Sequence, residues 1–189
     1  MSNQVGLRLE ERGDGVWALA GADASRFVPV DEFLAHLVDR NYSPKTVRAY
    51  GYDLLAFCRW LVQEEVELDQ VDIEVLLGFL RGCREARVPG RPGPNVVAMS
   101  GHRLDRYAPT TINRRLAAIS ALFAFVVMRD PSATNPVPKG KEARWLTTGE
   151  RNGLLAHTRR RAKDRSSLRL REPRRLPTAL SQEDAAELL

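Results

Sequence analysis

The pattern of apolar and polar positions changes its period near Pro29. Residues 5–9 and 16–20 alternate between apolar and polar types around a glycine-rich turn, which predicts a small β-hairpin. From residue 30 onward, apolar residues recur every three or four positions, which predicts amphipathic helices. Because an isolated hairpin is only marginally stable in water, we expect this one either to dock on the helices or to move freely.

The helical part of the pattern predicts four helices that bury one core. The clearest start is at Ser43-Pro44, because a serine N-cap accepts an otherwise unpaired backbone N–H and a proline in the first helical position has no N–H to leave unpaired. Residues 87–109, rich in proline and glycine, predict a long exposed loop before the last helix, and its role stays open. The expected helices run over about residues 30–40, about 44–65, from 72 towards the loop, and from 109 to about 129.

The predicted fold class is therefore all-α: a four-helix bundle with a small N-terminal β-hairpin and a basic C-terminal linker. We divide the chain into an N-terminal arm (residues 1–28), a helical domain (29–137), a basic linker (138–175) and a last segment (176–189). In that segment Ser181 precedes Asp184 by three residues, a pattern similar to a capping box, so a helix begins just before the sequence stops. We therefore expect that the sequence is cut before a further domain.

Composition excludes several classes of protein. Hydrophobic residues make up 43% and charged residues 28% of the 189 residues, which excludes disorder along the whole chain. No apolar run reaches the roughly 18–20 residues of a membrane span, and the charged N-terminus does not resemble a signal peptide. The two cysteines and three histidines form no disulfide framework and no metal-binding motif. We expect a cytoplasmic protein with no metal, no small-molecule cofactor and no membrane contact.

The positive charge is concentrated in one stretch. The chain has a net charge of +5, whereas residues 138–177 alone carry thirteen Lys and Arg against four Asp and Glu, a local charge of +9. Such an asymmetry indicates either an anionic polymer as a partner or a solvated linker that happens to be basic.

Two of the predicted helices also carry polar faces suited to a nucleic acid. On the second helix, basic and aromatic residues at offsets of 0, 3, 7 and 14 share the side away from the apolar stripe. The fourth helix opens with hydroxyl, amide and guanidinium groups, at the end of a helix that attracts phosphate. The candidate DNA contacts are Lys45, Thr46, Arg48, Tyr52, Arg59, Thr110, Thr111, Asn113, Arg114 and Arg115, with Arg159, Arg160 and Arg161 of the basic stretch as further candidates.

An ordinary solvated helix face explains the same spacing equally well. In that interpretation Arg114 pairs with an acid elsewhere in the chain.

The histidines and cysteines suggest no competing catalytic or metal-binding site. No histidine has a partner at the spacing of a metal site or a catalytic triad, and both cysteines lie in apolar stretches of the sequence.

Three stretches of the chain, in the right order, resemble the tyrosine recombinase (phage integrase) family. Residues 41–50 (NYSPKTVRAY), with Asp53-Leu54 and the following FxxWL, are similar to its core-binding domain. Residues 110–119 (TTINRRLAAI), with the later Asn135-Pro136, are similar to the last main helix of that domain and its exit. Residues 176–183 (LPTALSQE) resemble the start of the catalytic domain.

This resemblance implies a four-helix core-binding domain that clamps one face of duplex DNA while a C-terminal domain clamps the other. The second and fourth helices of the family cross the major groove, which is where Lys45, Arg48, Arg114 and Arg115 fall. The family's catalytic residues, a tyrosine with arginines, a lysine and histidines, belong to the catalytic domain. We therefore expect this chain to bind duplex DNA in recombination or integration, beside other recombinase protomers, and to have no catalytic residues of its own.

Two alternatives remain beside the recombinase interpretation. The chain could be a truncated helical module that binds protein, or a DNA-binding regulator without catalysis. A regulator would need a helix-turn-helix pair, which the spacing of adjacent helices does not show.

Overall fold

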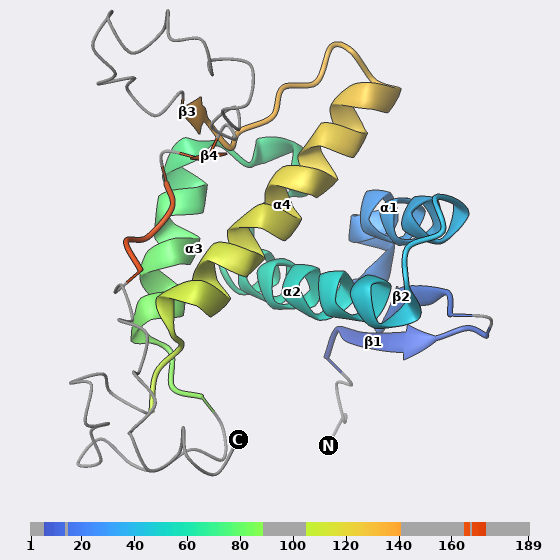
Figure 1. Ribbon diagram of the computed structural model, residues 1–189, viewed down its shortest axis with the longest axis horizontal. Coiled ribbons are helices and arrows are strands. Elements are labelled where there is room, and N and C mark those ends of the chain that lie inside the picture. The colour runs from blue at the N-terminus through green and yellow to red at the C-terminus, as the bar shows by residue number, and fades with distance from the viewer. Residues whose placement is uncertain (1–5, 14, 89–104, 141–164, 167, 173–189) are drawn as a thin grey trace, which may run out of the picture.

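A computed structural model describes residues 6–13, 15–88, 105–140, 165–166 and 168–172 of the protein. It confirms the predicted mostly helical fold, with four helices and a small N-terminal hairpin (Figure 1). The elements in chain order are β1 (Arg8–Glu11), β2 (Trp17–Ala20), η1 (Ala24–Phe27), α1 (Val28–Asp39), α2 (Pro44–Gln63), η2 (Leu68–Gln70), α3 (Ile73–Glu85), α4 (Pro109–Arg129), β3 (Lys139–Gly140) and β4 (Arg165–Ser166).

The helix boundaries follow local chemistry. Ser43 is the N-cap of α2, and its Oγ accepts the backbone N–H of Thr46 at 3.3 Å. Asp72 caps α3 in the same way, with its Oδ1 accepting the N–H of Val75 at 2.9 Å. The prediction for α1 starts two residues too late, because Pro29 is tolerated in the first turn of a helix and does not stop it.

The core lies where α4 crosses the bundle between α1 and α3 and packs on α2 (Figure 1). Leu54 and Phe57 of α2 and Ile119 of α4 are fully buried there. At the α2–α3 contact, the Trp60 ring lies over Gly78 and Gly82, where an added Cβ would come within 3.3 Å of the indole. Small residues one turn apart on α3 thus make room for the largest side chain of α2.

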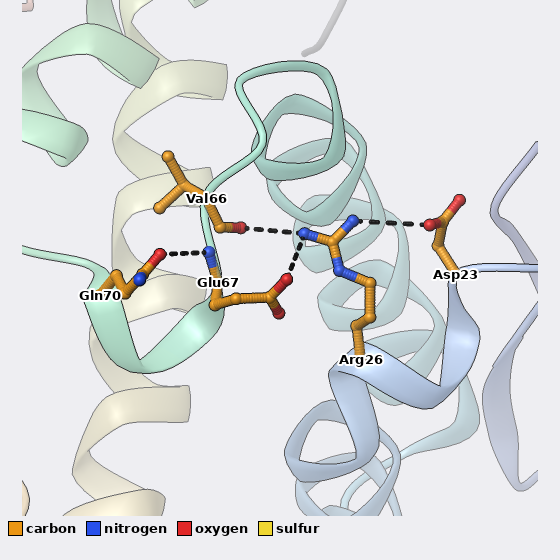
Figure 2. Close-up of polar contacts among 5 residues, drawn as sticks. All are labelled: Asp23, Arg26, Val66, Glu67 and Gln70. Atoms are coloured by element: carbon orange, nitrogen blue, oxygen red, sulfur yellow. Dashed lines mark hydrogen bonds and ion pairs between the residues drawn. The ribbon is translucent and has the colours of Figure 1, made fainter.

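Arg26 joins the start of α1 to the segment between α2 and α3 (Figure 2). Its Nη2 lies 2.7 Å from Glu67 Oε1 and donates to the Val66 carbonyl at 3.4 Å, while its Nη1 lies 3.4 Å from Asp23 Oδ1. Gln70 completes the turn by accepting the N–H of Glu67 at 3.1 Å. These polar contacts, together with the buried Leu68 and Val71 of the same segment, hold the α2–α3 connection against the bundle.

The hairpin docks on α1 and α2, which is the first of the two outcomes expected from sequence. Leu9 lies so close to Gly51 that an added Cβ would be 2.7 Å from its Cδ2. Arg59 Nε donates to the Leu7 carbonyl at 2.8 Å, and the Leu19 N–H donates to Asp31 Oδ1 at 2.7 Å. These two hydrogen bonds and the burial of apolar residues such as Leu7 and Leu19 in the core therefore supply the tertiary support that a two-stranded ribbon lacks by itself.

Part of the predicted basic linker is attached to the helical domain. Strands β3 and β4 pair antiparallel, with Lys139 opposite Ser166. Leu168 and Leu170 then pack against the core, and the Asn113 side chain of α4 bonds both backbone groups of Leu170. Nothing in the sequence pattern predicts this contact. The proposed division at residues 28, 137 and 175 stays a prediction, and residues 89–104 and 176–189 lie outside the described part.

Helix α4 qualifies the expectation from the sequence that no segment is long and apolar enough to span a membrane. In the described residues α4 is long and apolar enough to cross a membrane by length and composition alone, with a mean hydropathy of 1.4 over its best window. Of that window, 44% is buried within the bundle, and the core helix of a soluble protein passes the same test. We attribute the apolar character of α4 to its place in the core.

Asp31 gives a prediction about pH. Burial raises the pKa of its carboxyl above the ordinary 3.8, and the hydrogen bond from the Leu19 N–H and the nearby Arg12 charge offset this only in part. An acid with a raised pKa in the folded state destabilises the fold as the pH rises through its titration.

Asp31→Asn keeps an acceptor for Leu19 and removes the buried charge. We expect the variant to be at least as stable as the wild type at neutral pH and to lose this part of the pH dependence, measured by urea unfolding from acid to neutral pH. A uniform loss of stability at every pH would contradict this account.

Candidate nucleic-acid interface

A hollow of about 320 Å³ lies between the first turns of α2 and the second and third turns of α4. Lys45 and Thr46 of α2 line one side, and Arg114 of α4 lines the other. The structure therefore brings together three of the sequence-predicted residues. The remaining lining residues are Ala49, Tyr50, Asp53, Ala117 and Ala118.

Arg114 is anchored by a carboxylate at the base of this hollow. Its Nε and Nη2 donate to the two carboxylate oxygens of Asp53 at 2.8 and 3.0 Å. The Asp53 side chain is 5% exposed, whereas the Arg114 side chain is 62% exposed. This is the pairing with an acid that the sequence left open. A two-point pair of this kind fixes the orientation of the guanidinium and offsets part of its charge.

The polar face predicted for α2 exists. Lys45, Arg48, Tyr52 and Arg59 are all exposed. Within the described part of the chain, neither Lys45 nor Arg48 forms a hydrogen bond or an ion pair. These two charges are therefore not neutralised by a neighbouring carboxylate, in contrast to Arg114.

Two other predicted residues on α2 already serve the fold. Arg59 uses its Nε to hold the Leu7 carbonyl of the hairpin. Thr46 lies in the first turn of α2, where its hydroxyl is 2.8 Å from the hydroxyl of the N-cap Ser43. Their role in binding stays a prediction.

The predicted residues at the start of α4 point to different surroundings. Arg115 is half-buried, with its guanidinium carbon 4.1 Å from the centre of the Tyr107 ring and its Nη1 donating to Cys83 Sγ at 3.4 Å. Asn113 is buried, and its amide nitrogen donates to the Leu170 carbonyl and to Glu172 Oε1 at 2.9 and 2.7 Å. Thr110 is exposed and Thr111 is half-buried. Arg114 is therefore the cation of this turn that faces the hollow.

The surroundings of Arg48 could be predicted only in part from the sequence pattern. Its guanidinium carbon lies 5.6 Å from the centre of the Trp17 ring and 5.5 Å from that of Tyr52. Trp17 comes from strand β2. Tyr52 follows Arg48 by one helical turn, so the contact between these two side chains could be predicted from their spacing. The contact with the hairpin could not, because nothing in the spacing connects either residue to Trp17.

A second hollow, of about 700 Å³, is larger but has the opposite electrostatic character. Glu67, Asp69 and Asp130 contribute carboxylates to it, and its one lining arginine, Arg26, already contacts Glu67. Such a rim repels a polyanion. Of these two hollows, the one between α2 and α4 is the better match for a nucleic acid.

The remaining candidates from the sequence are three arginines of the basic stretch, possible metal ligands and the two cysteines. Arg159, Arg160 and Arg161 lie outside the described residues. Within the described ranges, no group of three or more His, Cys, Asp and Glu side chains is placed to hold a metal ion. Cys58 and Cys83 are free and buried, as expected from their apolar context.

Comparison with known proteins identifies the helical region. Residues 30–91 match the family described as the phage integrase N-terminal SAM-like domain. This part of the chain is similar to the phage integrase SAM-like domain. The matched segment contains α2, α3 and nearly all of α1, whereas the hairpin and α4 lie outside it. This confirms the family resemblance seen in the sequence.

Curated relatives of the chain are tyrosine recombinases. The tyrosine recombinase XerC of Roseiflexus castenholzii is 33% identical over 117 residues, which are 58% of this chain and 31% of that protein. The tyrosine recombinase XerD of Haemophilus influenzae is 29% identical over 135 residues, which are 67% and 39% of the two chains. The aligned part of this chain thus spans about a third of the length of these relatives. No solved structure matches the chain significantly.

Proposed function

We propose that the SAM-like domain binds duplex DNA in site-specific recombination, with the exposed side of α2 and the second turn of α4 as its contact surface. We call Lys45, Arg48, Arg59 and Arg114 the cationic face. The observation that carries the proposal is that Lys45 lines a hollow to which α4 contributes Arg114. Lys45 and the nearby Arg48 of α2 are both exposed, and neither forms a hydrogen bond or an ion pair among the described residues. The similarity to proteins named tyrosine recombinases supports the same assignment.

The chemistry of the cationic face suits a phosphodiester backbone. Lys and Arg contribute most of the affinity for DNA by displacing condensed counterions, and this affinity depends strongly on salt. Lys45 lies in the first turn of α2, where the helix dipole adds to the attraction for a phosphate. Ala49 and Ala117 line the hollow with small side chains, which would let a backbone approach both helices.

We propose binding and no strand transfer for the described residues. Transfer needs a tyrosine with cations arranged around the reacting phosphorus. Tyr107 with Arg115 is the described pair that comes nearest to this arrangement, but both are half-buried and the guanidinium lies over the ring face. That geometry is one of packing. We further propose a cytoplasmic location, consistent with two buried free thiols, and assembly with other recombinase protomers on DNA.

Removing either free cation of α2 tests the proposal. We expect Lys45→Ala and Arg48→Ala each to weaken binding to a mixed-sequence DNA duplex and to reduce the slope of log affinity against log salt by about 0.9 for each lost phosphate contact. The melting temperature should hardly change, because both side chains are exposed.

Arg81→Ala is the matched control. Arg81 is an exposed arginine of α3, and it does not line the hollow or belong to the cationic face. Its removal changes the net charge by the same amount. An equal loss of affinity and slope in this control would show that binding depends on total charge, and would contradict the assigned surface.

A further inference from the structure

The β1–β2 hairpin lies outside the family match and runs along the same helix that carries the cationic face. Its turn meets the start of α2, where an added Cβ on Gly15 would be 3.6 Å from Pro44. Its middle contacts Gly51 through Leu9, and its first strand is preceded by Leu7, whose carbonyl accepts from Arg59. The hairpin therefore follows α2 from its first turn to its last third, at the edge of the exposed face.

Trp17 of the hairpin and Tyr52 of α2 flank Arg48. The two ring centres are 6.3 Å apart with an interplanar angle of 50°, and the Arg48 guanidinium carbon is at nearly equal distance from both, at 5.6 and 5.5 Å. A guanidinium held by aromatic rings keeps its in-plane N–H donors for another partner. Within the described residues Arg48 has no such partner, so its donor capacity is unused.

We propose that the hairpin is a third element of the DNA-binding surface, and that Trp17 is a positioning residue that holds Arg48, together with Tyr52, ready for a backbone phosphate. This inference rests on the proposed function. An arginine that is already ordered loses less rotamer freedom when it binds than one that moves freely in water. Trp17 thus acts through Arg48 and need not touch DNA.

A double-mutant cycle on the full chain tests the inference, with a mixed-sequence DNA duplex as the probe. We expect Trp17→Ala to weaken binding about two- to fivefold, the loss that corresponds to an exposed cation–π contact. In the Arg48→Ala background the same change should have no further effect, since the two residues act as one unit. Trp17→Phe keeps an aromatic ring over the guanidinium and should retain most of the affinity.

Leu9→Ala is the control for a general loss of hairpin stability. It shortens the side chain that contacts Gly51 and removes neither of the aromatic rings beside Arg48. If Trp17→Ala weakens binding equally with and without Arg48, or if Leu9→Ala reproduces its effect, the positioning role is wrong. If the wild type binds duplex DNA and Trp17→Ala binds equally well, this inference is wrong while the proposed function stands. If the wild type has no salt-dependent affinity for duplex DNA, both are wrong.

Discussion

Replacing Phe57 with alanine should lower the free energy of unfolding by about 3–5 kcal/mol. Phe57 is fully buried on the inner side of α2, and its ring meets that of Phe79 edge-to-face with centres 5.0 Å apart. The change removes a large apolar side chain and leaves a cavity that the neighbouring helices cannot fill completely. Because a small domain has only about 5–15 kcal/mol of stability, we expect the variant to be partly unfolded at 37 °C.

Urea unfolding followed by circular dichroism measures this effect. Gln63→Ala serves as the control, because Gln63 is an exposed residue of the same helix and its removal should change stability by less than about 0.5 kcal/mol. Equal effects of the two substitutions would mean that the inner face of α2 is assigned to the wrong side.

The second large effect concerns the ion pair of the hollow. Arg114→Ala removes both donors to Asp53, whose buried carboxylate is then left without them. We expect a loss of about 1–3 kcal/mol, the cost of an unsatisfied buried polar group. The loss should be smaller when Asp53→Asn is added, because the second substitution removes the unpaired charge.

The comparison of these two variants separates stability from binding. Both lack the Arg114 cation, so both should bind DNA more weakly than the wild type at a temperature where they are folded. Chemical unfolding and DNA titration of the same preparations give the two quantities. If Arg114→Ala is as stable as the wild type, the pair contributes nothing measurable and Asp53 does not position the cation.

The parts of the fold that depend on neighbours in sequence could be predicted. The start of α2 follows from Ser43 and Pro44, and the two strands follow from alternation around a glycine-rich turn. The exposed side of α2 could be predicted for the same reason, since residues three, seven and fourteen positions apart share a side of any helix.

The partners of the candidate residues could not be predicted, because they come from distant parts of the chain. Arg114 and its acid are 61 residues apart, Arg59 and the Leu7 carbonyl are 52 apart, and Asn113 and Leu170 are 57 apart. Helical spacing states which side chains share a face, but tertiary packing decides which of them already have a partner. Sequence therefore placed Arg114 and Arg115 together as phosphate ligands, whereas the structure directs one to the hollow and the other to Tyr107.

The contact of Asn113 with Leu170 has a consequence for how the domain is tethered to whatever follows it in the chain. The helix leads away from Asn113 to Arg129 over about 24 Å, at 1.5 Å per residue. The chain then returns through the β3–β4 pair, and Leu170 bonds to Asn113 at the end of α4 where the helix began. Leu170 is thus held beside the turn of α4 that carries Arg114. The residues that follow Leu170 therefore start from a fixed position on the helical domain. A fragment cut at residue 137 would lose this anchor and would leave a buried amide without its partners.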